Sequence, residues 1–234
     1  MLSIVVPAYN ESGRLPGSLR RMREHFDAAG EEYEVIVVDD GSADETYASS
    51  VELARGWPQL RVLRFTRNRG KGAAVREGML AARGEHRLFS DADLSTPLDE
   101  LPRLREKLTG TTRVAIASRG LRDSQIEVHQ QKRRELMGRT YNKLLQLLVL
   151  RGVHDSQCGF KVFTADAAVA CFEPLRTMRF GFDAEVLVRA KAHGWEIAEV
   201  PVRWRHVEAS RVNSLRDSSR MLFDLVRLRL SRRR

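Results

Sequence analysis

The 234-residue sequence has only two cysteines, no long apolar run and few aromatic side chains. Neither Cys158 nor Cys171 has metal-ligand spacing around it, so no thiolate metal site is expected and a reducing compartment is the simplest interpretation. No stretch approaches the roughly 18 to 20 uninterrupted apolar residues of a membrane-spanning helix, and we expect no transmembrane segment. Residues 2–8 form a strand-like run rather than the start of a signal peptide.

Charged side chains, by contrast, are abundant. The chain has 40 Lys and Arg against 31 Asp and Glu, which gives a formal net charge of +9. This excess favours an anionic partner, and charge alone leaves nucleic acid, a phosphorylated substrate and an acidic lipid surface open. With 42% apolar and 30% charged residues, the composition is that of a globular protein with one substantial core.

Short apolar, β-branched runs alternate with longer segments of helical periodicity. Strands are expected at residues 2–8, 34–40, 61–66, 86–91, 113–118, 160–164 and 196–204. Helices are expected near residues 12–29, 44–55, 72–83, 98–108, 130–150, 183–193 and 216–231. This alternation predicts an α/β fold in one domain, with a central, mostly parallel, Rossmann-like sheet flanked by helices.

Polar clusters follow four of the expected strands. They are Tyr-Asn-Glu at 9–11, Asp-Asp-Gly-Ser at 39–42, Asp-Ala-Asp at 91–93 and Ser-Arg at 118–119. In open α/β sheets, ligands bind at the carboxyl ends of the strands. The four clusters therefore predict one shared crevice.

Asp91 and Asp93 are the best candidates for metal ligands. Two carboxylates one residue apart after a buried strand can turn toward one hard cation, and Mg²⁺ or Mn²⁺ commonly joins carboxylates to a substrate phosphate. The alternative is a simple turn, because Asp-Leu-Ser-Thr-Pro at 93–97 also suits the start of a helix.

Two further strand ends carry candidate ligand-binding residues. Asp39 could accept hydrogen bonds from a base or a ribose, and Gly41 allows a tight turn. Lys71, between two glycines at the start of a helix, could bind a diphosphate. The pair Gly70 and Gly72 imitates a dinucleotide-binding fingerprint, but Val75 stands at its third position, so a dehydrogenase is not expected.

The segment Asp-Ser-Gln-Cys-Gly-Phe-Lys at 155–161 is unusually polar for the entrance to a strand. Asp155 could be a general base, an orienting carboxylate or only a cap or ion-pair partner. Arginines could clamp phosphate, although most arginines of so basic a chain are solvated. The candidates are Arg119, Arg133, Arg134 and Arg211.

The motifs together resemble glycosyltransferase family 2. They are Pro-Ala-Tyr-Asn-Glu at 7–11, Val-Asp-Asp-Gly-Ser at 38–42, Gly-Lys-Gly at 70–72, Asp-Ala-Asp at 91–93 and Ser-Arg at 118–119. More narrowly, the chain resembles the polyprenyl-phosphate hexose synthases. Within these, residues 91–96, 155–161, 202–204 and 210–212 are similar to the dolichyl-phosphate β-glucosyltransferases. Mannosyl homologues more often have Gln in place of Ser95.

The resemblance implies a GT-A fold and a role for each motif. The residues expected to bind the nucleotide sugar are Pro7, Ala8, Tyr9, Glu11, Asp39, Lys71, Gly72, Asp91, Ala92 and Arg119. Asp91 and Asp93 would hold Mg²⁺ or Mn²⁺. Arg134, Ser210 and Arg211 would bind the acceptor phosphate, and the catalytic candidates are Asp93, Asp155 and Gln157. The phosphate-facing loop departs from the family pattern, because Ala209 replaces the usual Gly and Arg211 the usual Lys.

The implied reaction is the inverting transfer of a hexose, with UDP-glucose as the favoured donor, to a polyprenyl phosphate. GDP-mannose as donor, or a soluble family member with a hydroxyl acceptor, are the alternatives. A nucleic-acid-binding protein is not expected, since acidic pairs at the strand ends would repel phosphate unless a metal intervenes. A sugar nucleotidyltransferase is disfavoured because its Gly-rich N-terminal loop with Arg is missing.

The C-terminal part suggests contact with a membrane surface. We expect a catalytic domain at 1–212 and a basic amphipathic tail at 213–234, where residues 216–234 hold seven Arg against two Asp among apolar residues. Such a mixture suits an interfacial helix on an anionic bilayer, and the apolar run at 141–150 could add to it. The alternative is a helix packed on the core with a solvated basic end. The expected location is the cytoplasmic face of a membrane, with peripheral contact.

Overall fold

The computed structural model describes residues 1–128, 132–207 and 223–230, and for residues 132–137 and 139 it describes the backbone only. The strands are β1 (Leu2–Ala8), β2 (Tyr33–Asp39), β3 (Leu60–Arg64), β4 (His86–Ser90), β5 (Thr112–Ser118), β6 (Gln125–Val128), β7 (Phe160–Thr164), β8 (Glu196–Pro201) and β9 (Arg203–Arg205). The helices are α1 (Leu15–Ala29), α2 (Thr46–Arg55), α3 (Lys71–Ala81), α4 (Leu101–Arg105), α5 (Lys132–Leu148), α6 (Ala165–Phe172) and α7 (Phe182–Ala192), with a 3-10 turn η1 (Leu98–Glu100). Residues 223–230 are also helical.

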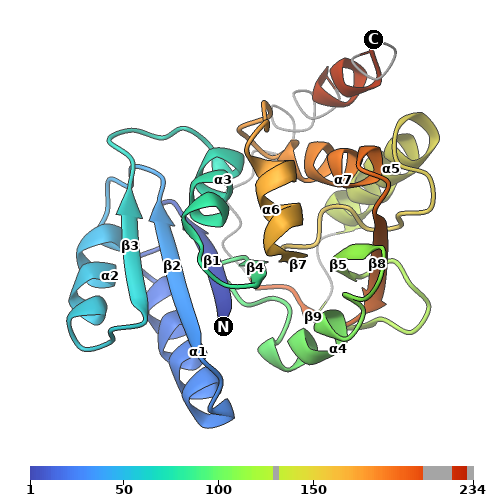
Figure 1. The fold of residues 1–234 in the computed structure, drawn as a ribbon. Helices are drawn as coiled ribbons and strands as arrows, with labels where there is room; N and C mark the ends of the chain where they lie inside the picture. Colours follow the sequence, from blue (N-terminus) through green and yellow to red (C-terminus); the bar gives the residue numbers. More distant parts are fainter. Residues whose placement is uncertain (129–131, 208–222, 231–234) are drawn as a thin grey trace.

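Seven strands form one mixed sheet in the order β3-β2-β1-β4-β7-β5-β8 (Figure 1). β7 runs antiparallel to both of its neighbours, β4 and β5, whereas the other pairs are parallel. The predicted central, mostly parallel sheet is therefore confirmed. The reversal of β7 was not anticipated, because an apolar run carries no information about strand direction.

Alternate residues of the central strands face two separate cores. On one face, Val5 and Ile36 pack with residues of α3, α6 and α7. On the other, Ile4 and Val35 pack with residues of α1 and α4. Every residue of β1 and β2 is buried. A strand covered by helices on both faces needs apolar side chains at successive positions, and this explains the continuous apolar runs in the sequence.

Several element boundaries differ from the predictions. α1 begins at Leu15, immediately before Pro16, and not at residue 12. The predicted strand at 196–204 is two strands, because β9 leaves the main sheet and pairs with β6 in a second, two-stranded sheet. The predicted helix at 98–108 is the turn η1 followed by the short α4. β6 and α6 were missed, and both are short.

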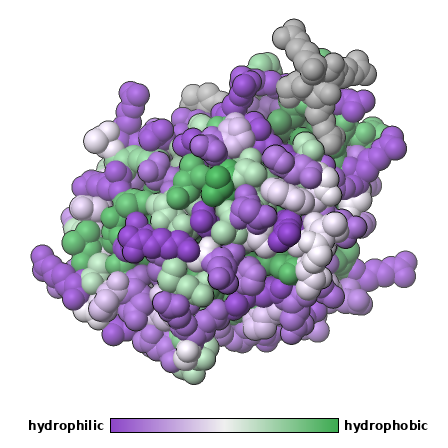
Figure 2. All heavy atoms as spheres, in the orientation of Figure 1, coloured by the Kyte–Doolittle hydropathy of each residue, from purple (hydrophilic) through white to green (hydrophobic). Residues whose placement is uncertain are grey.

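The apolar run at 141–150 mainly serves the core. Leu145, Val149 and Leu150 are buried there, and of the apolar side chains in the run only Leu147 is largely exposed. The helix at 223–230 contributes Leu225 to the same core. No helix within the described ranges is long and apolar enough to cross a membrane. Hydrophilic side chains cover most of the face shown in Figure 2, with apolar groups between them.

Candidate active site

The four polar strand ends lie at the end of the sheet where the parallel strands finish, which we call the carboxyl edge. β1 pairs in parallel with β2 on one side and with β4 on the other, so the loops that follow these strands are adjacent. β7 runs in the opposite direction between β4 and β5, so the segment that precedes it, residues 155–159, reaches the same edge. The loop after β5, which carries Arg119, lies beside that segment. The polar strand ends are therefore adjacent, as predicted, and a shared crevice between them stays a prediction.

Asp40, just after β2, holds the loop that precedes α3. Its carboxylate accepts hydrogen bonds from Asn68 Nδ2 at 2.9 Å and from the backbone N–H groups of Arg69 at 2.6 Å and Gly70 at 2.8 Å. Burial raises the pKa of Asp40, and the two backbone hydrogen bonds oppose the rise. Asp40 is therefore committed to the loop that carries Lys71.

Asp39, the last residue of β2, has one carboxylate oxygen without a hydrogen bond among the described residues. It is fully buried, and its Oδ1 accepts a hydrogen bond from the Ser42 N–H at 3.1 Å. Arg64 Nε lies 3.1 Å from Oδ2 but is not aligned with it, since Oδ2 has no hydrogen-bond partner among the described residues. The two adjacent acids therefore have different tasks: one fixes a loop and the other offers an acceptor to a ligand.

The glycines on both sides of Lys71 are needed for packing. Gly70 has a φ of +107°, and a Cβ there would lie 2.4 Å from the Met178 carbonyl oxygen. A Cβ on Gly72 would lie 2.7 Å from the Thr177 carbonyl oxygen. The start of α3 thus sits directly against the segment at 177–182. The structure gives Gly72 this packing reason, and its predicted contact with the nucleotide sugar stays a prediction.

Asp91 and Lys71 form an ion pair at the carboxyl edge. Lys71 Nζ lies 2.6 Å from Asp91 Oδ1, and both side chains are partly exposed, at 24% and 31%. Lys71 Nζ also lies 5.2 Å from the centre of the Phe89 ring, a cation–π contact. A Cβ on Gly159 would lie 1.9 Å from Asp91 Oδ2, so only glycine at position 159 leaves room for this carboxylate.

Asp93 lies on the same turn as Asp91. Its Oδ1 accepts a hydrogen bond from the Ser95 N–H at 3.0 Å. The residue between Asp93 and Ser95, Leu94, has a positive φ of 49°, a strained conformation for a leucine that costs about 1–3 kcal/mol. Ala92 is buried in the core, which leaves only its backbone for a ligand.

The acidic turn fits a divalent cation that is shared with a substrate. Asp91 and Asp93 supply carboxylate oxygens, which Mg²⁺ and Mn²⁺ prefer. Within the described part of the chain, no group of three or more His, Cys, Asp or Glu could hold a metal. Mg²⁺ usually binds through one or two carboxylates together with substrate phosphates and water, so two acids are a sufficient protein contribution.

Asp155 is locked in an ion pair with Arg119. Arg119 donates from Nε to Oδ2 at 2.6 Å, from Nη2 to Oδ1 at 2.9 Å and from its backbone N–H to Oδ2 at 3.0 Å. Burial acts to raise the pKa of Asp155, but the charge and hydrogen bonds of Arg119 outweigh it and lower the pKa to about 2. The Gln157 N–H also donates to Asp155, at 3.2 Å. A carboxylate held in this way suits an orienting role better than that of a base.

The predicted residues on β1 and its following loop lie beside Asp39. Pro7 and Ala8 belong to the buried strand, and the Ala8 carbonyl accepts the Asp40 N–H at 2.8 Å. Tyr9 is 39% exposed. Glu11 is bound by Arg14, which donates from Nε and, at 2.6 Å, from Nη2.

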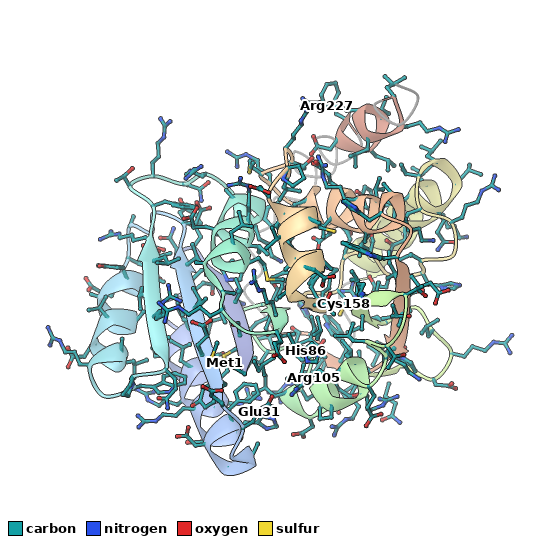
Figure 3. The ribbon with its side chains drawn as sticks, viewed as in Figure 1. Met1, Glu31, His86, Arg105, Cys158 and Arg227 are labelled. Carbon is teal, nitrogen blue, oxygen red and sulfur yellow. The ribbon has the colours of Figure 1, made fainter. Side chains whose placement is uncertain are left out.

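Sequence reasoning missed three charged residues at this edge. Arg14 pairs with Glu11, and the spacing of three residues could have indicated it. Lys161, on β7, is almost fully buried, pairs with Asp183 on α7 and donates to the Cys158 carbonyl at 2.8 Å. A lysine within the apolar run Phe-Lys-Val-Phe was the available signal. Cys158, whose carbonyl accepts the hydrogen bond from Lys161, is labelled in Figure 3.

Three predicted residues of the acceptor site cannot be placed. The side chain of Arg134, together with Ser210 and Arg211, lies outside the described residues. Their role toward an acceptor phosphate stays a prediction.

The fold and the site define a class: an α/β enzyme whose sheet ends in an acidic turn, a lysine and a free buried carboxylate oxygen, a set suited to a nucleoside diphosphate. A family model described as Glycosyl transferase family 2 matches residues 3–172, and the chain belongs to this family of glycosyltransferases.

Relatives and a solved structure support the assignment. The chain is 37% identical to the dolichyl-phosphate β-glucosyltransferase of Drosophila melanogaster, over 90% of this chain and 69% of the relative. It is 34% identical to the human dolichyl-phosphate β-glucosyltransferase, over 98% of this chain and 75% of the relative. Glucosyl-3-phosphoglycerate synthase from Mycobacterium tuberculosis, in complex with Mn²⁺, UDP and phosphoglyceric acid, has the same fold, with a TM-score of 0.72, 21% identity and coverage of 98% and 78%. The predicted family and GT-A fold are confirmed.

Proposed function

We propose that this glycosyltransferase moves glucose from UDP-glucose to the phosphate group of a polyprenyl phosphate such as dolichyl or undecaprenyl phosphate, with inversion at the anomeric carbon. The observation that carries the proposal is the similarity to dolichyl-phosphate β-glucosyltransferases over nearly the whole chain, together with the crevice of Asp39, Lys71 and Asp91.

The two parts of the donor would bind to different residues: the nucleoside to Asp39 and the diphosphate to Lys71. Asp39 Oδ2, the free buried acceptor at the end of β2, suits an N–H or O–H of the nucleoside. Lys71 brings a positive charge to the diphosphate from the start of α3. In this structure its ammonium group is bound to Asp91, so a diphosphate would share that cation with the carboxylate. The donor would therefore lie across the ends of β2, β1 and β4.

Asp91 and Asp93 would hold Mg²⁺ or Mn²⁺. When bound, the cation would neutralise negative charge on the departing nucleoside diphosphate. Gly159 supports this assignment, because its missing side chain leaves the space that Asp91 Oδ2 occupies.

A phosphate acceptor removes the need for a strong base. The second pKa of a phosphate monoester is about 6, so the acceptor already carries a nucleophilic oxygen anion at neutral pH. Asp155, with a pKa of about 2, would then hold Arg119 in place instead of removing a proton. Arg119, held in this way, would face the sugar or the acceptor phosphate.

A donor panel tests the proposal. The purified protein is incubated with UDP-glucose or GDP-mannose, with Mn²⁺, Mg²⁺ or EDTA, and with or without a short-chain polyprenyl phosphate. We expect transfer from UDP-glucose to the lipid phosphate that depends on the metal, and tighter calorimetric binding of UDP than of GDP. Transfer from GDP-mannose only would overturn the donor, and transfer to a soluble hydroxyl acceptor but not to the lipid would overturn the acceptor.

We further propose that the C-terminal segment contacts an anionic membrane surface on the cytoplasmic side. Phe223, Val226 and Leu230 are spaced by three and four residues and are exposed at 67%, 47% and 61%. They form one stripe of the helix, whereas Leu225 packs into the core. Arg227, labelled in Figure 3, and Arg229 lie between the stripe residues. An exposed apolar stripe flanked by arginines suits insertion among acidic lipid headgroups.

The position of this helix relative to the crevice also supports membrane contact. A Cβ on Gly181 would lie 2.8 Å from Asp224 Oδ2, so Asp224 packs against the segment at 177–182, which also contacts the start of α3. If this helix lies on the membrane, a lipid-linked acceptor in that membrane would be close to the residues around Lys71.

Liposome flotation tests the membrane contact. We expect the protein to float with anionic vesicles at low salt. The triple variant Phe223→Ser, Val226→Ser, Leu230→Ser should lose most of this binding. Val169→Ser, which removes an exposed valine from α6, is the matched control. Equal flotation of the triple variant would overturn the role of the stripe, and no flotation of the parent protein would overturn the membrane contact.

A further inference from the structure

Arg14, in the loop between β1 and α1, has one guanidinium nitrogen without a partner. Nε and Nη2 donate to the Glu11 carboxylate, which occupies two of the three nitrogens. Nη1 is buried and has no hydrogen-bond partner within the described part of the chain. A buried donor that loses water without gaining a partner is destabilising, so natural proteins rarely keep one unless a ligand or water completes it.

The surroundings of Arg14 indicate the chemistry of that partner. β1 lies between β2 and β4 in the sheet, so the loop that carries Arg14 lies between the free oxygen of Asp39 and the acidic turn of Asp91 and Asp93. Burial lowers the pKa of Arg14, but Glu11 and the charges of Asp93 and Asp91 outweigh it and raise the pKa overall. Arg14 is therefore close enough to the acidic turn to interact with it electrostatically.

Charge balance shows what this cation can contribute. After β1 and β4 and at the start of α3, Glu11, Asp91 and Asp93 bring three negative charges, and Lys71 and Arg14 bring two positive charges, while Asp39 has its own ion pair with Arg64. A nucleoside diphosphate adds further negative charge and would be repelled by the carboxylates. Lys71 is already paired with Asp91, whereas the free Nη1 of Arg14 can donate a charge-assisted hydrogen bond without releasing Glu11.

We propose that Arg14 binds the donor directly, with Nη1 donating a hydrogen bond to a phosphoryl oxygen of the nucleoside diphosphate. Glu11 fixes the plane of the guanidinium group, so the free nitrogen is oriented before the donor arrives. Arg14 and Lys71 then approach the diphosphate from the ends of β1 and α3. This inference rests on the proposed function only in taking a nucleoside diphosphate as the donor.

Calorimetry with UDP and with uridine tests the inference, because the two probes differ only in the diphosphate. Arg14→Ala should weaken UDP binding by about 10- to 100-fold, the usual range for a hydrogen bond to a charged group, and change uridine binding much less. Arg14→Lys should recover part of the UDP affinity through its charge. Arg20→Ala, which removes an exposed arginine from α1, is the control and should leave both affinities unchanged. Thermal unfolding of each variant verifies that it is folded.

The outcomes separate this inference from the proposed function. If UDP binds the parent protein and Arg14→Ala equally well, Arg14 does not contact the diphosphate. If Arg14→Ala weakens UDP and uridine by the same factor, the arginine acts only by holding Glu11, and the inference fails. If UDP does not bind the parent protein at all, the proposed donor fails and Arg14 has no diphosphate to bind.

Discussion

The amino edge of the seven-stranded sheet, where the parallel strands begin, and the carboxyl edge, where they finish, both carry many charges, but they differ in whether their buried polar atoms have hydrogen-bond partners. At the amino edge, Glu34 accepts hydrogen bonds from Ser3 Oγ at 2.7 Å, Arg61 Nη1 at 2.8 Å and the Arg83 N–H at 2.7 Å. At the carboxyl edge, Arg14 Nη1, Asp39 Oδ2 and Ser118 Oγ are buried without a hydrogen-bond partner among the described residues, although Arg64 lies 3.1 Å from Asp39 Oδ2.

The amino edge has the features of a structural network. Arg105 donates to Glu31 at 2.6 Å and to His86 Nδ1 at 3.2 Å, and Figure 3 labels these three side chains in one group. A surface hollow nearby is lined in part by Asp27 and Glu31. Asp27 is already bound by the Tyr33 hydroxyl, at 2.6 Å. Paired charges in a hollow stabilise the fold and leave little capacity for a ligand.

The comparison teaches that unsatisfied buried groups, more than charge itself, distinguish the functional edge. A buried polar atom without a partner is unfavourable in the free protein and gains a hydrogen bond when a ligand arrives. Substitutions at the carboxyl edge should therefore affect activity more than stability, and substitutions at the amino edge should do the reverse.

Asp93→Ala should have the largest effect. Removal of one carboxylate from the acidic turn should reduce transfer by about a hundredfold to a thousandfold, the range seen when one electrostatic contact to a transition state is lost. The side chain is only partly buried and accepts one backbone hydrogen bond, so the fold should persist. Initial rates with Mn²⁺ and a thermal unfolding curve check both parts. Full activity in EDTA would remove the metal from the proposal.

Asp155→Asn should be the exception at the carboxyl edge and affect both activity and stability, because the Asp155 carboxylate is buried and already paired with Arg119. The change leaves Arg119 without its ionic partner, and breaking a buried ion pair on one side typically destabilises a protein by about 3–5 kcal/mol. Urea unfolding of the variant measures this loss. Arg55→Ala, which breaks an exposed pair with Glu52, is the control and should change stability by less than about 1 kcal/mol.

The pH dependence of Asp155 has a definite sign. Its folded-state pKa of about 2 is below the ordinary value of about 3.9, so its stabilisation is present above about pH 4 and is lost as the pH falls through about 2. Asp155 should therefore contribute no limb to the rate profile between about pH 5 and pH 9. A limb in this interval that disappears in Asp155→Asn would restore the role of Asp155 as a general base.

Gly159→Ala should have an intermediate effect that is confined to the carboxyl edge. The added Cβ would overlap Asp91 Oδ2, so the Asp91 carboxylate must rotate out of its position beside Lys71. We expect a loss of about tenfold in kcat/KM, since misplacement of a catalytic group by an ångström costs up to about a hundredfold. Gly17→Ala, in α1, has open space around its added Cβ and is the control. Unchanged kinetics for Gly159→Ala would mean that Asp91 needs no fixed position.

Most of the fold could be predicted from the sequence because strands covered on both faces consist of consecutive apolar residues. β1 and β7 were predicted with their observed bounds, whereas β6, with only four mostly exposed residues, carries no such run. The shared edge could be predicted from the polar strand ends. The partners of those residues could not, because the contact between Gly159 and Asp91 joins residues 68 positions apart, and the pairing of Lys161 with Asp183 requires the packing of α7 on the sheet.

Glu34→Gln should have the smallest effect on activity. It tests the other half of the comparison, that substitutions at the amino edge lower stability more than activity. Glu34 is buried at the amino edge. Burial acts to raise its pKa, but the hydrogen bonds from Ser3, Arg83 and Arg61 outweigh burial and lower the pKa. The amide retains the shape but removes the charge that faces Arg61, so the free energy of unfolding should fall by about 1–3 kcal/mol. Because this edge is remote from Asp91 and Lys71, kcat/KM per folded molecule should stay unchanged. A loss of kcat/KM as large as that of Gly159→Ala, with stability intact, would show that the two edges are not functionally separate.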